Sequence, residues 1–251
     1  MRFRNLLVCL LLFLVTVSCN HYENNGDSVY YKSWNEGQGS RIKTLYGVDP
    51  KKFHLLKYDR YAKDDRLVFF DGDTVQGADA TSFEAIGEYY AKDKYHGYYG
   101  KDSIRTSRGA SFKIIDSYYS TDDNDIFYDT IPLNVVSTQK FRFVFNSGEQ
   151  AWARWTTDGK YYYYMNFRIP SYDYNNVVLY KNSGGIARDK RWVYFLNRKL
   201  NYDDGGKLAI DTIDIPTFKV TGYLDCRDKN GCINVFHGRE KCGVSSGRKF
   251  N

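Results

Sequence analysis

The sequence predicts an all-β protein built from stacked repeats, and three observations support this fold class. Aromatic residues make up 18% of the 251 residues, with 24 tyrosines against 4 prolines and 2 methionines, and aromatic side chains suit the pleated, half-buried surface of a sheet. A short motif recurs at regular spacing, and aspartates separate the aromatic runs as turn residues do. No apolar run has helical period and length, so only short helical turns are expected, near residues 49–52 or 79–82.

The first repeated element is a turn flanked by aromatic residues. Tyr-Ala-Lys-Asp at residues 61–64 returns at residues 90–93, and Tyr-Ser-Thr-Asp follows at residues 119–122, a spacing of 29 each time. In five copies the fifth and sixth residues after the aspartate are both aromatic. The aspartates are Asp64, Asp93, Asp122, Asp158 and Asp189, and the pairs are Phe69–Phe70, Tyr98–Tyr99, Phe127–Tyr128, Tyr163–Tyr164 and Tyr194–Phe195. Weaker copies lie at the two ends, Val29-Tyr30-Tyr31 and Asp228 with Val235–Phe236.

A second element, Gly-x-Asp-x-x-x-Phe, repeats in phase with the first at residues 47–53 and 77–83. Each phenylalanine begins a strand-like stretch, so one unit of about 29–36 residues forms a short antiparallel hairpin or a three-stranded meander. Such a unit cannot bury a face alone, and neighbours must stack. An open stack and a propeller-like ring are both compatible with the pattern, and the unequal spacings of 29, 29, 36 and 31 residues between the aspartates favour the open stack.

These motifs resemble those of a known family. Lys-Asp-Lys-Tyr-x-x-Tyr-Tyr at residues 92–99, Asp-Gly-Lys-Tyr-Tyr-Tyr-Tyr at residues 158–164 and the Gly-x-Asp-x-x-x-Phe elements are similar to the DKNYY family of bacterial repeat proteins, many of which are exported lipoproteins. The resemblance covers most of residues 27–236. It implies a fold type and a cell-envelope setting, and it provides no active site to carry over.

The N-terminal segment reads as a lipoprotein signal. Residues 1–18 contain two arginines and no acidic residue, and their apolar run from Leu6 to Val17 is shorter than the roughly 20 residues of a membrane-spanning helix. Ser18-Cys19 resembles the end of a bacterial lipobox, although Thr16 stands where that family prefers leucine. We expect cleavage before Cys19 and lipid attachment to it; an ordinary secretory signal is the alternative. Asn20 favours the outer membrane over the inner one.

The rest of the chain divides into three parts: a short tether at 19–28, the repeat domain at 29–236, and a C-terminal tail at 237–251. Cys226, Cys232 and Cys242 are the disulfide candidates near the C-terminus, since an exported protein can form disulfides. Three cysteines allow one bridge, and the sequence leaves open which pair forms it. A zinc site with His237 is less favoured, because the spacing lacks the close cysteine pair of structural zinc sites.

No catalytic, cofactor or metal site stands out. The carboxylates recur in register with the repeat, which is expected of turn-forming aspartates. Asp71-Gly72-Asp73 and residues 122–125 are acidic, but neither has a glutamate at the twelfth loop position that calcium loops require. After removal of residues 1–18 the net charge is +4, from 34 basic and 30 acidic residues, with no basic run. We therefore expect neither a nucleic-acid partner nor an enzyme.

The aromatic pairs suggest a binding role. Adjacent residues of a strand point to opposite faces, so one ring of each pair should be core, and the other rings should line up as an outward stripe. Such a stripe suits a protein or a glycan partner. The sequence thus favours a non-enzymatic envelope lipoprotein that acts as an interaction module, with a toxin-immunity protein and then a glycan-binding protein as the alternatives.

Overall fold

The computed structural model describes residues 21–201, 210, 212–236 and 238–242, and these residues form no α-helix. They fold into seven small antiparallel sheets, here called sheets 1 to 7 in chain order. Three short 3-10 helices lie in links between sheets: η1 (Gly109–Ser111), η2 (Tyr174–Asn176) and η3 (Ile215–Thr217). The all-β fold class is confirmed.

Each sheet is a meander in which strands consecutive in the chain are neighbours. Sheet 1 contains β1 (His21–Asn24), β2 (Val29–Asn35) and β3 (Gly39–Thr44). Sheet 2 contains β4 (His54–Leu55), β5 (Tyr61–Lys63), β6 (Val68–Phe70) and β7 (Asp73–Thr74). Sheet 3 contains β8 (Glu84–Ala85), β9 (Tyr90–Lys92), β10 (Gly97–Tyr99) and β11 (Asp102–Ile104). Sheet 4 contains β12 (Lys113–Ile114), β13 (Tyr119–Thr121), β14 (Ile126–Tyr128) and β15 (Ile131–Pro132). Sheet 5 contains β16 (Arg142–Phe143), β17 (Trp155–Thr157), β18 (Tyr162–Tyr164) and β19 (Phe167–Arg168). Sheet 6 contains β20 (Val178–Leu179), β21 (Ile186–Arg188), β22 (Val193–Phe195) and β23 (Arg198–Lys199). Sheet 7 contains β24 (Lys219–Gly222), β25 (Asp225–Asp228), β26 (Gly231–Asn234) and β27 (Gly238–Glu240).

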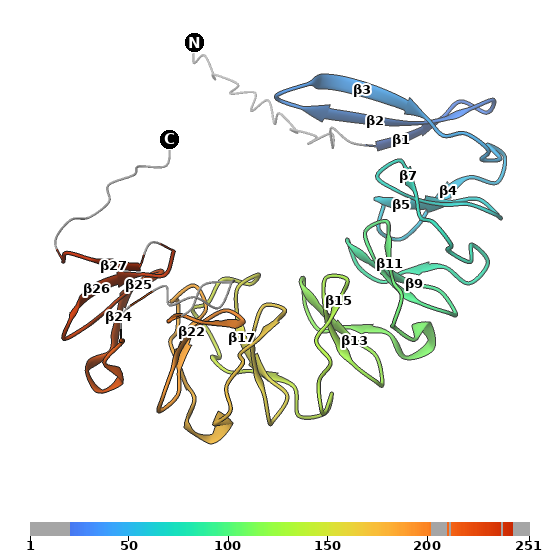
Figure 1. Cartoon of the computed structure of the whole chain (residues 1–251). Coiled ribbons are helices and arrows are strands. Elements are labelled where there is room, and N and C mark those ends of the chain that lie inside the picture. The colour runs from blue at the N-terminus through green and yellow to red at the C-terminus, as the bar shows by residue number, and fades with distance from the viewer. Residues whose placement is uncertain (1–20, 202–209, 211, 237, 243–251) are drawn as a thin grey trace, which may run out of the picture.

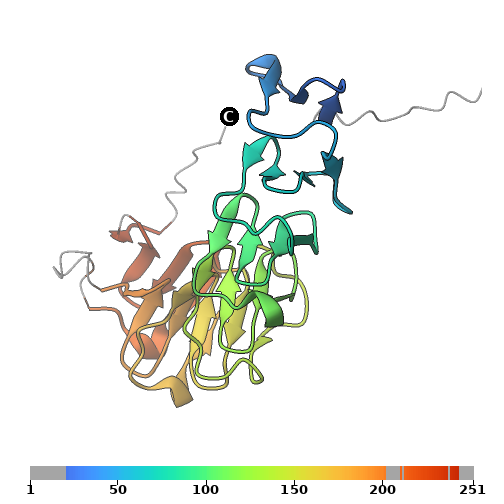
Figure 2. The same cartoon turned by 90° about the vertical axis from the view of Figure 1, so that its right-hand side faces the viewer.

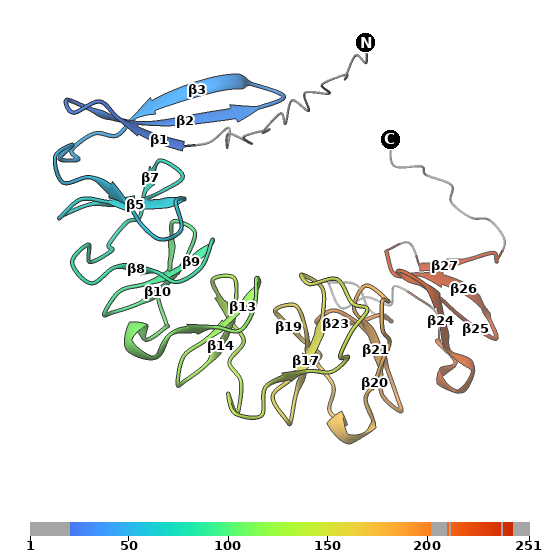
Figure 3. The ribbon, with the colours of Figure 1, turned by 180° about the vertical axis from the view of Figure 1, so that it is seen from behind.

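The sheets follow one another along an open arc. Sheet 1 and sheet 7 stand at the two ends of this arc and do not meet (Figure 1), and the view from behind shows the same opening (Figure 3). Turned by 90°, the first and last sheets lie at different depths, so the arc is a section of a spiral (Figure 2). The described residues therefore form an open stack and not a closed ring.

The core lies between the sheets, and the aromatic pairs build it. The first ring of a pair faces the preceding sheet, and the second faces the following one. Phe69 packs with Tyr31 of sheet 1, for example, whereas Phe70 packs with Tyr98 of sheet 3. The alternation of faces was predicted, but the expected outward stripe is wrong, because face-to-face stacking buries both faces of each inner sheet.

Hydroxyl and indole groups link neighbouring sheets. Tyr61 Oη donates to the carbonyl oxygens of Tyr89 and Gly100 in sheet 3, at 2.7 and 3.0 Å. At the same position of sheet 5, Trp155 Nε1 donates to Tyr180 O at 3.0 Å. These bonds satisfy polar atoms that stacking would otherwise bury without partners.

Three sequence expectations need correction. Six of the seven described sheets have a fourth strand, of three residues in sheets 3 and 7 and of two residues in the others. The predicted three-stranded meander missed this strand because so short a strand carries almost no sequence pattern. The tether at 19–28 contains β1, which pairs with β2, and the tail at 237–251 contains β27, which pairs with β26. In sheet 7 the residues five and six after Asp228 are Ile233 and Asn234, so Val235–Phe236 is not the aromatic pair.

The cysteine pairing is resolved. Cys232 and Cys242 form a disulfide with their Cα atoms 5.1 Å apart, while Cys226 is a buried free thiol. The bridge joins β26 to the residues that follow β27, at the last sheet of the stack. Residues 1–18 and Cys19 lie outside the described residues, and the lipid anchor stays a prediction.

Candidate functional site: a tyrosine-lined groove on the concave edge

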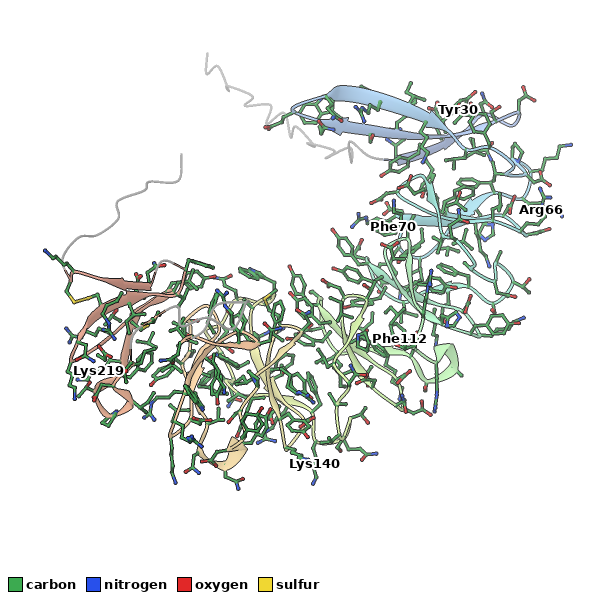
Figure 4. The ribbon with its side chains drawn as sticks, in the orientation of Figure 1. Tyr30, Arg66, Phe70, Phe112, Lys140 and Lys219 are labelled. Carbon is green, nitrogen blue, oxygen red and sulfur yellow. A yellow bond between two sulfur atoms is a disulfide. The ribbon has the colours of Figure 1, made fainter. Side chains whose placement is uncertain are left out.

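The stack has a convex edge and a concave edge, and the convex edge carries the repeated turns. Arg66, in the turn between β5 and β6, and Lys140, in the link before sheet 5, both point away from the centre of the arc (Figure 4). Each turn begins at the repeated aspartate. We call these residues the turn aspartates: Asp64, Asp93, Asp122, Asp158, Asp189 and Asp228.

Asp158 shows what a turn aspartate does. Its side chain is 0% exposed. Oδ1 accepts hydrogen bonds from the backbone N–H groups of Lys160 and Tyr161, at 2.9 and 2.7 Å, and so closes the turn. Oδ2 accepts from the N–H of Val136, in the link that leads into the same sheet, and from Tyr163 Oη. One carboxylate thus joins a turn, a link and a strand.

The same kind of network recurs along the edge and lowers the pKa of five of the six turn aspartates. Burial alone would raise the pKa of Asp93, but hydrogen bonds from the N–H groups of Asp79 and His96 outweigh it and lower that pKa. The balance has the same sign at Asp64, Asp158, Asp189 and Asp228. Carboxylates held in this way by backbone donors stabilise the turns.

The opposite, concave edge carries the hairpins that follow the aromatic pairs. Phe70 lies toward this side of the arc (Figure 4). The next residue, Asp71, has a φ of 48°, and its N–H donates to Arg60 O at 2.9 Å. Asp129 and Tyr118 repeat this arrangement in sheet 4, with a φ of 52° and a bond of 2.9 Å. The residue four before each turn aspartate is thereby fixed on the concave edge.

This concave-edge position varies from sheet to sheet, unlike the turn aspartates. In sheets 2 to 7 it is occupied by Arg60, Tyr89, Tyr118, Arg154, Gly185 and Leu224. At this position the repeat fixes the backbone bond and lets the side chain differ from sheet to sheet. The concave edge therefore presents different side chains in different sheets, as a binding surface does.

Two arginines cover aromatic rings on the concave edge. The Arg60 guanidinium lies 4.5 Å from the centre of the Phe70 ring and 4.1 Å from that of Tyr89, and its Nε is 3.1 Å from both carboxylate oxygens of Asp71. The Arg154 guanidinium lies 4.0 Å from the Phe143 ring and pairs with Asp116 of sheet 4. The contact between two neighbouring sheets is called a joint here, and the joints between sheets 2 and 3 and between sheets 4 and 5 each contain an arginine.

Tyr89 in sheet 3 and Tyr118 in sheet 4 occupy the concave-edge position where these two sheets meet, and a groove of about 620 Å³ lies there. Tyr89 is 45% exposed and stacks on Tyr99, with the ring centres 5.7 Å apart and the planes at 22°. Tyr118 stacks on Tyr128 at 6.2 Å and 16°. The tyrosines that line the groove are Tyr58, Tyr89, Tyr90, Tyr99 and Tyr118.

The charged residues at the groove are acidic. Glu88 and Asp116 line it, and none of its lining residues is basic. A second hollow of about 600 Å³ has the opposite character: it is polar and contains Lys101 and Arg105, and Lys101 is already paired with Asp73 at 3.0 Å. Arg60 covers Tyr89 and Arg154 pairs with Asp116, so the groove offers the other tyrosine rings and the charge of Glu88 to a ligand.

Sequence reasoning did not find this groove. Tyr58 and Tyr118 lie outside the aromatic pairs, in links between first and second strands, where no periodic signal exposes them. The detectable signal is the position four residues before each turn aspartate, where tyrosine stands in sheets 3 and 4 and arginine in sheets 2 and 5. The acidic segments at Asp71-Gly72-Asp73 and residues 122–125 serve structure, and no group of three or more His, Cys, Asp or Glu among the described residues is arranged to hold a metal ion.

The comparison with family models agrees with the repeat. The model of the DKNYY family matches residues 15–102 and 98–236, so the chain belongs to the DKNYY family. No curated protein matches the chain, and no solved structure does. The part of the chain that the structure describes contains no helix long and apolar enough to cross a membrane.

Proposed function

We propose that this chain is a non-enzymatic lipoprotein of the bacterial envelope, anchored through Cys19 in the outer membrane, that binds a partner protein along its concave edge. The observation that carries the proposal is the tyrosine-lined groove between sheets 3 and 4. Its aromatic side chains come from three consecutive sheets; Tyr89 is exposed, and Tyr58, Tyr99 and Tyr118 are half-buried. Tyrosines grouped around a hollow are typical of the centre of a protein interface.

The stacked architecture supports an interaction role. Each sheet rests on its neighbours through buried aromatic rings, so the edge is a rigid, preorganised surface. Preorganisation reduces the entropy lost on binding. The turn aspartates, which would be the first candidates for acid–base chemistry, are saturated with backbone hydrogen bonds.

Site-specific crosslinking tests the binding part of the proposal. A photoreactive p-benzoylphenylalanine is placed at Tyr89 on the concave edge in living cells, and a matched one at Tyr95, which is 57% exposed in the turn on the convex edge. We expect a specific protein adduct from position 89 and none from position 95. Adducts with polysaccharide alone would favour the glycan-binding alternative, and equal labelling at both positions would refute a concave-edge interface.

Fractionation tests the anchor separately. The Cys19→Ala variant should leave the membrane fraction, because the lipid chains on this cysteine would provide the attachment. Density separation of inner and outer membranes then checks the second part of the localisation. If the Cys19→Ala variant stays in the membrane fraction, the lipoprotein assignment is wrong.

A further inference from the structure

The groove between sheets 3 and 4 differs from the neighbouring joints in one respect: neither of its two sheets contributes an arginine to it, although Arg60 of sheet 2 lies 4.1 Å from the ring centre of Tyr89. In sheet 2, Asp71 accepts a hydrogen bond from Tyr31 Oη of the preceding sheet at 3.1 Å and is also paired with Arg60. Asp129 occupies the same position in sheet 4, and Tyr99 of the preceding sheet interacts with it in the same way. Tyr118, however, replaces the arginine.

Asp129 consequently lacks the partner that Asp71 has. Its Oδ1 atom is buried and has no hydrogen-bond partner among the described residues, and burial raises the pKa of this carboxyl group. Asp129 does not line the groove, but Tyr99, which contacts it, does. A buried carboxylate without a counter-charge favours the arrival of a cation.

The surroundings of the groove are negative as a whole. Burial raises the pKa of Tyr90, and the charges of Asp129 and Asp116 raise it further. Glu88 is exposed at the groove and forms no ion pair with any described residue. Asp116 is partly compensated by Arg154 of sheet 5. Negative charge beside stacked aromatic faces is the environment that an organic cation prefers.

We propose that the groove binds the guanidinium of an arginine side chain presented by the partner protein, stacked on the tyrosine rings and attracted by Glu88 and Asp129. This inference rests on the proposed function and names the group that the site recognises. The chain supplies its own precedent, since Arg60 and Arg154 lie 4.1 and 4.0 Å from aromatic ring centres in the adjacent joints. Planar, weakly hydrated guanidinium groups stack on aromatic faces better than ammonium groups do.

The test is a titration of the mature chain, followed by NMR, with the peptide Ac-Gly-Arg-Gly-amide. The same peptide with citrulline in place of arginine is the neutral control of equal shape. We expect chemical-shift changes that saturate with the arginine peptide and are centred on residues of the groove. Equal binding of the citrulline peptide, or shifts located elsewhere, would overturn the inference.

One substitution tests whether an arginine of the chain itself, placed at the groove, competes with the arginine peptide. Tyr118→Arg gives sheet 4 the residue that sheets 2 and 5 have at this position, and the new guanidinium should lie near Asp129. Affinity for the arginine peptide should fall on the order of tenfold, the size of one cation–π contact with a charge partner. Tyr95→Arg adds the same charge at the convex edge and should leave the affinity unchanged.

A second variant keeps the test valid if Tyr118→Arg fails to fold. Glu88→Gln removes an exposed charge from the groove and should weaken binding several-fold, whereas Glu36→Gln removes an equally exposed charge from the turn of sheet 1 and should have no effect. Identical affinity in the Glu88→Gln variant and the unmodified chain would contradict the inference. Crosslinking at Tyr89 without arginine binding would leave the proposed function standing and refute only this identification.

Discussion

The convex and the concave edges of the stack are built from the same strands but obey different rules. On the convex edge an aspartate begins the turn in six sheets, and in each of them its Oδ1 accepts a hydrogen bond from a backbone N–H of that turn. On the concave edge the backbone bond is constant, while the side chain changes between arginine, tyrosine, glycine and leucine. The comparison indicates that the convex edge specifies the fold and that the concave edge is free to acquire binding specificity.

Acid should destabilise the convex edge in five sheets at once, which is the largest effect that we expect. The turn aspartates with lowered pKa values contribute stability that is complete above the unfolded-state pKa of about 3.9 and is lost as the pH falls through the lower folded-state pKa. The free energy of unfolding should therefore be level near neutrality and drop steeply below about pH 4.

Urea denaturation of the mature chain between pH 2 and pH 7 measures this drop. In the Asp158→Asn variant the slope below about pH 4 should be shallower by about one proton, since one linked carboxyl group is missing. An unchanged slope would show that Asp158 does not contribute to the acid transition.

The next largest effect should come from removing a single turn aspartate. Asp158→Ala leaves three backbone N–H donors and the Tyr163 hydroxyl without their acceptor. At about 1–3 kcal/mol for each unsatisfied buried group, with some rescue by water, we expect the free energy of unfolding to fall by roughly 3–5 kcal/mol.

A change on the other edge provides the matched control for that variant. Tyr89→Leu on the half-exposed concave edge should cost about 1 kcal/mol or less, the size of its contact with Arg60. Urea midpoints of the two variants compare the edges directly. Similar losses in both would show that the two edges share the stabilising role.

The repeated elements of the fold could be predicted from the sequence, whereas the groove, which occurs at one place in the stack, could not. The in-phase recurrence of the turn aspartates and the Gly-x-Asp-x-x-x-Phe elements has a direct physical basis: the N–H of Asp49 in one element donates to Asp64 of the other at 2.7 Å. Stacked repeats were predictable because both elements must be present for each turn to close.

The groove could not be predicted from the sequence, because it depends on the absence of an arginine at position 118. Tyr118 is unremarkable in a chain with 24 tyrosines, and its meaning appears only beside Arg60 and Asp71 of sheet 2, at equivalent positions. The outward stripe failed for a related reason. Period-two alternation tells which rings share a face, but not whether a neighbouring sheet covers that face.

The smallest effect should come from the hydroxyl that three sheets add to the turn. Tyr98, Tyr163 and Tyr194 each donate to their turn aspartate, at 2.7, 2.8 and 2.5 Å, whereas Phe69 and Phe127 occupy the same position without a hydroxyl. Tyr163→Phe should cost about 1 kcal/mol in the free energy of unfolding, because Asp158 keeps its three backbone donors.

The reverse change, Phe127→Tyr, should give Asp122 a fourth donor and leave stability equal or slightly higher. Urea denaturation of both variants measures the pair. If Tyr163→Phe lowered the free energy of unfolding by about 3 kcal/mol, as much as we expect for Asp158→Ala, the tyrosine hydroxyl and not the backbone network would stabilise the convex edge. In that case sheets 2 and 4, which have phenylalanine at this position, would be the weak points of the stack.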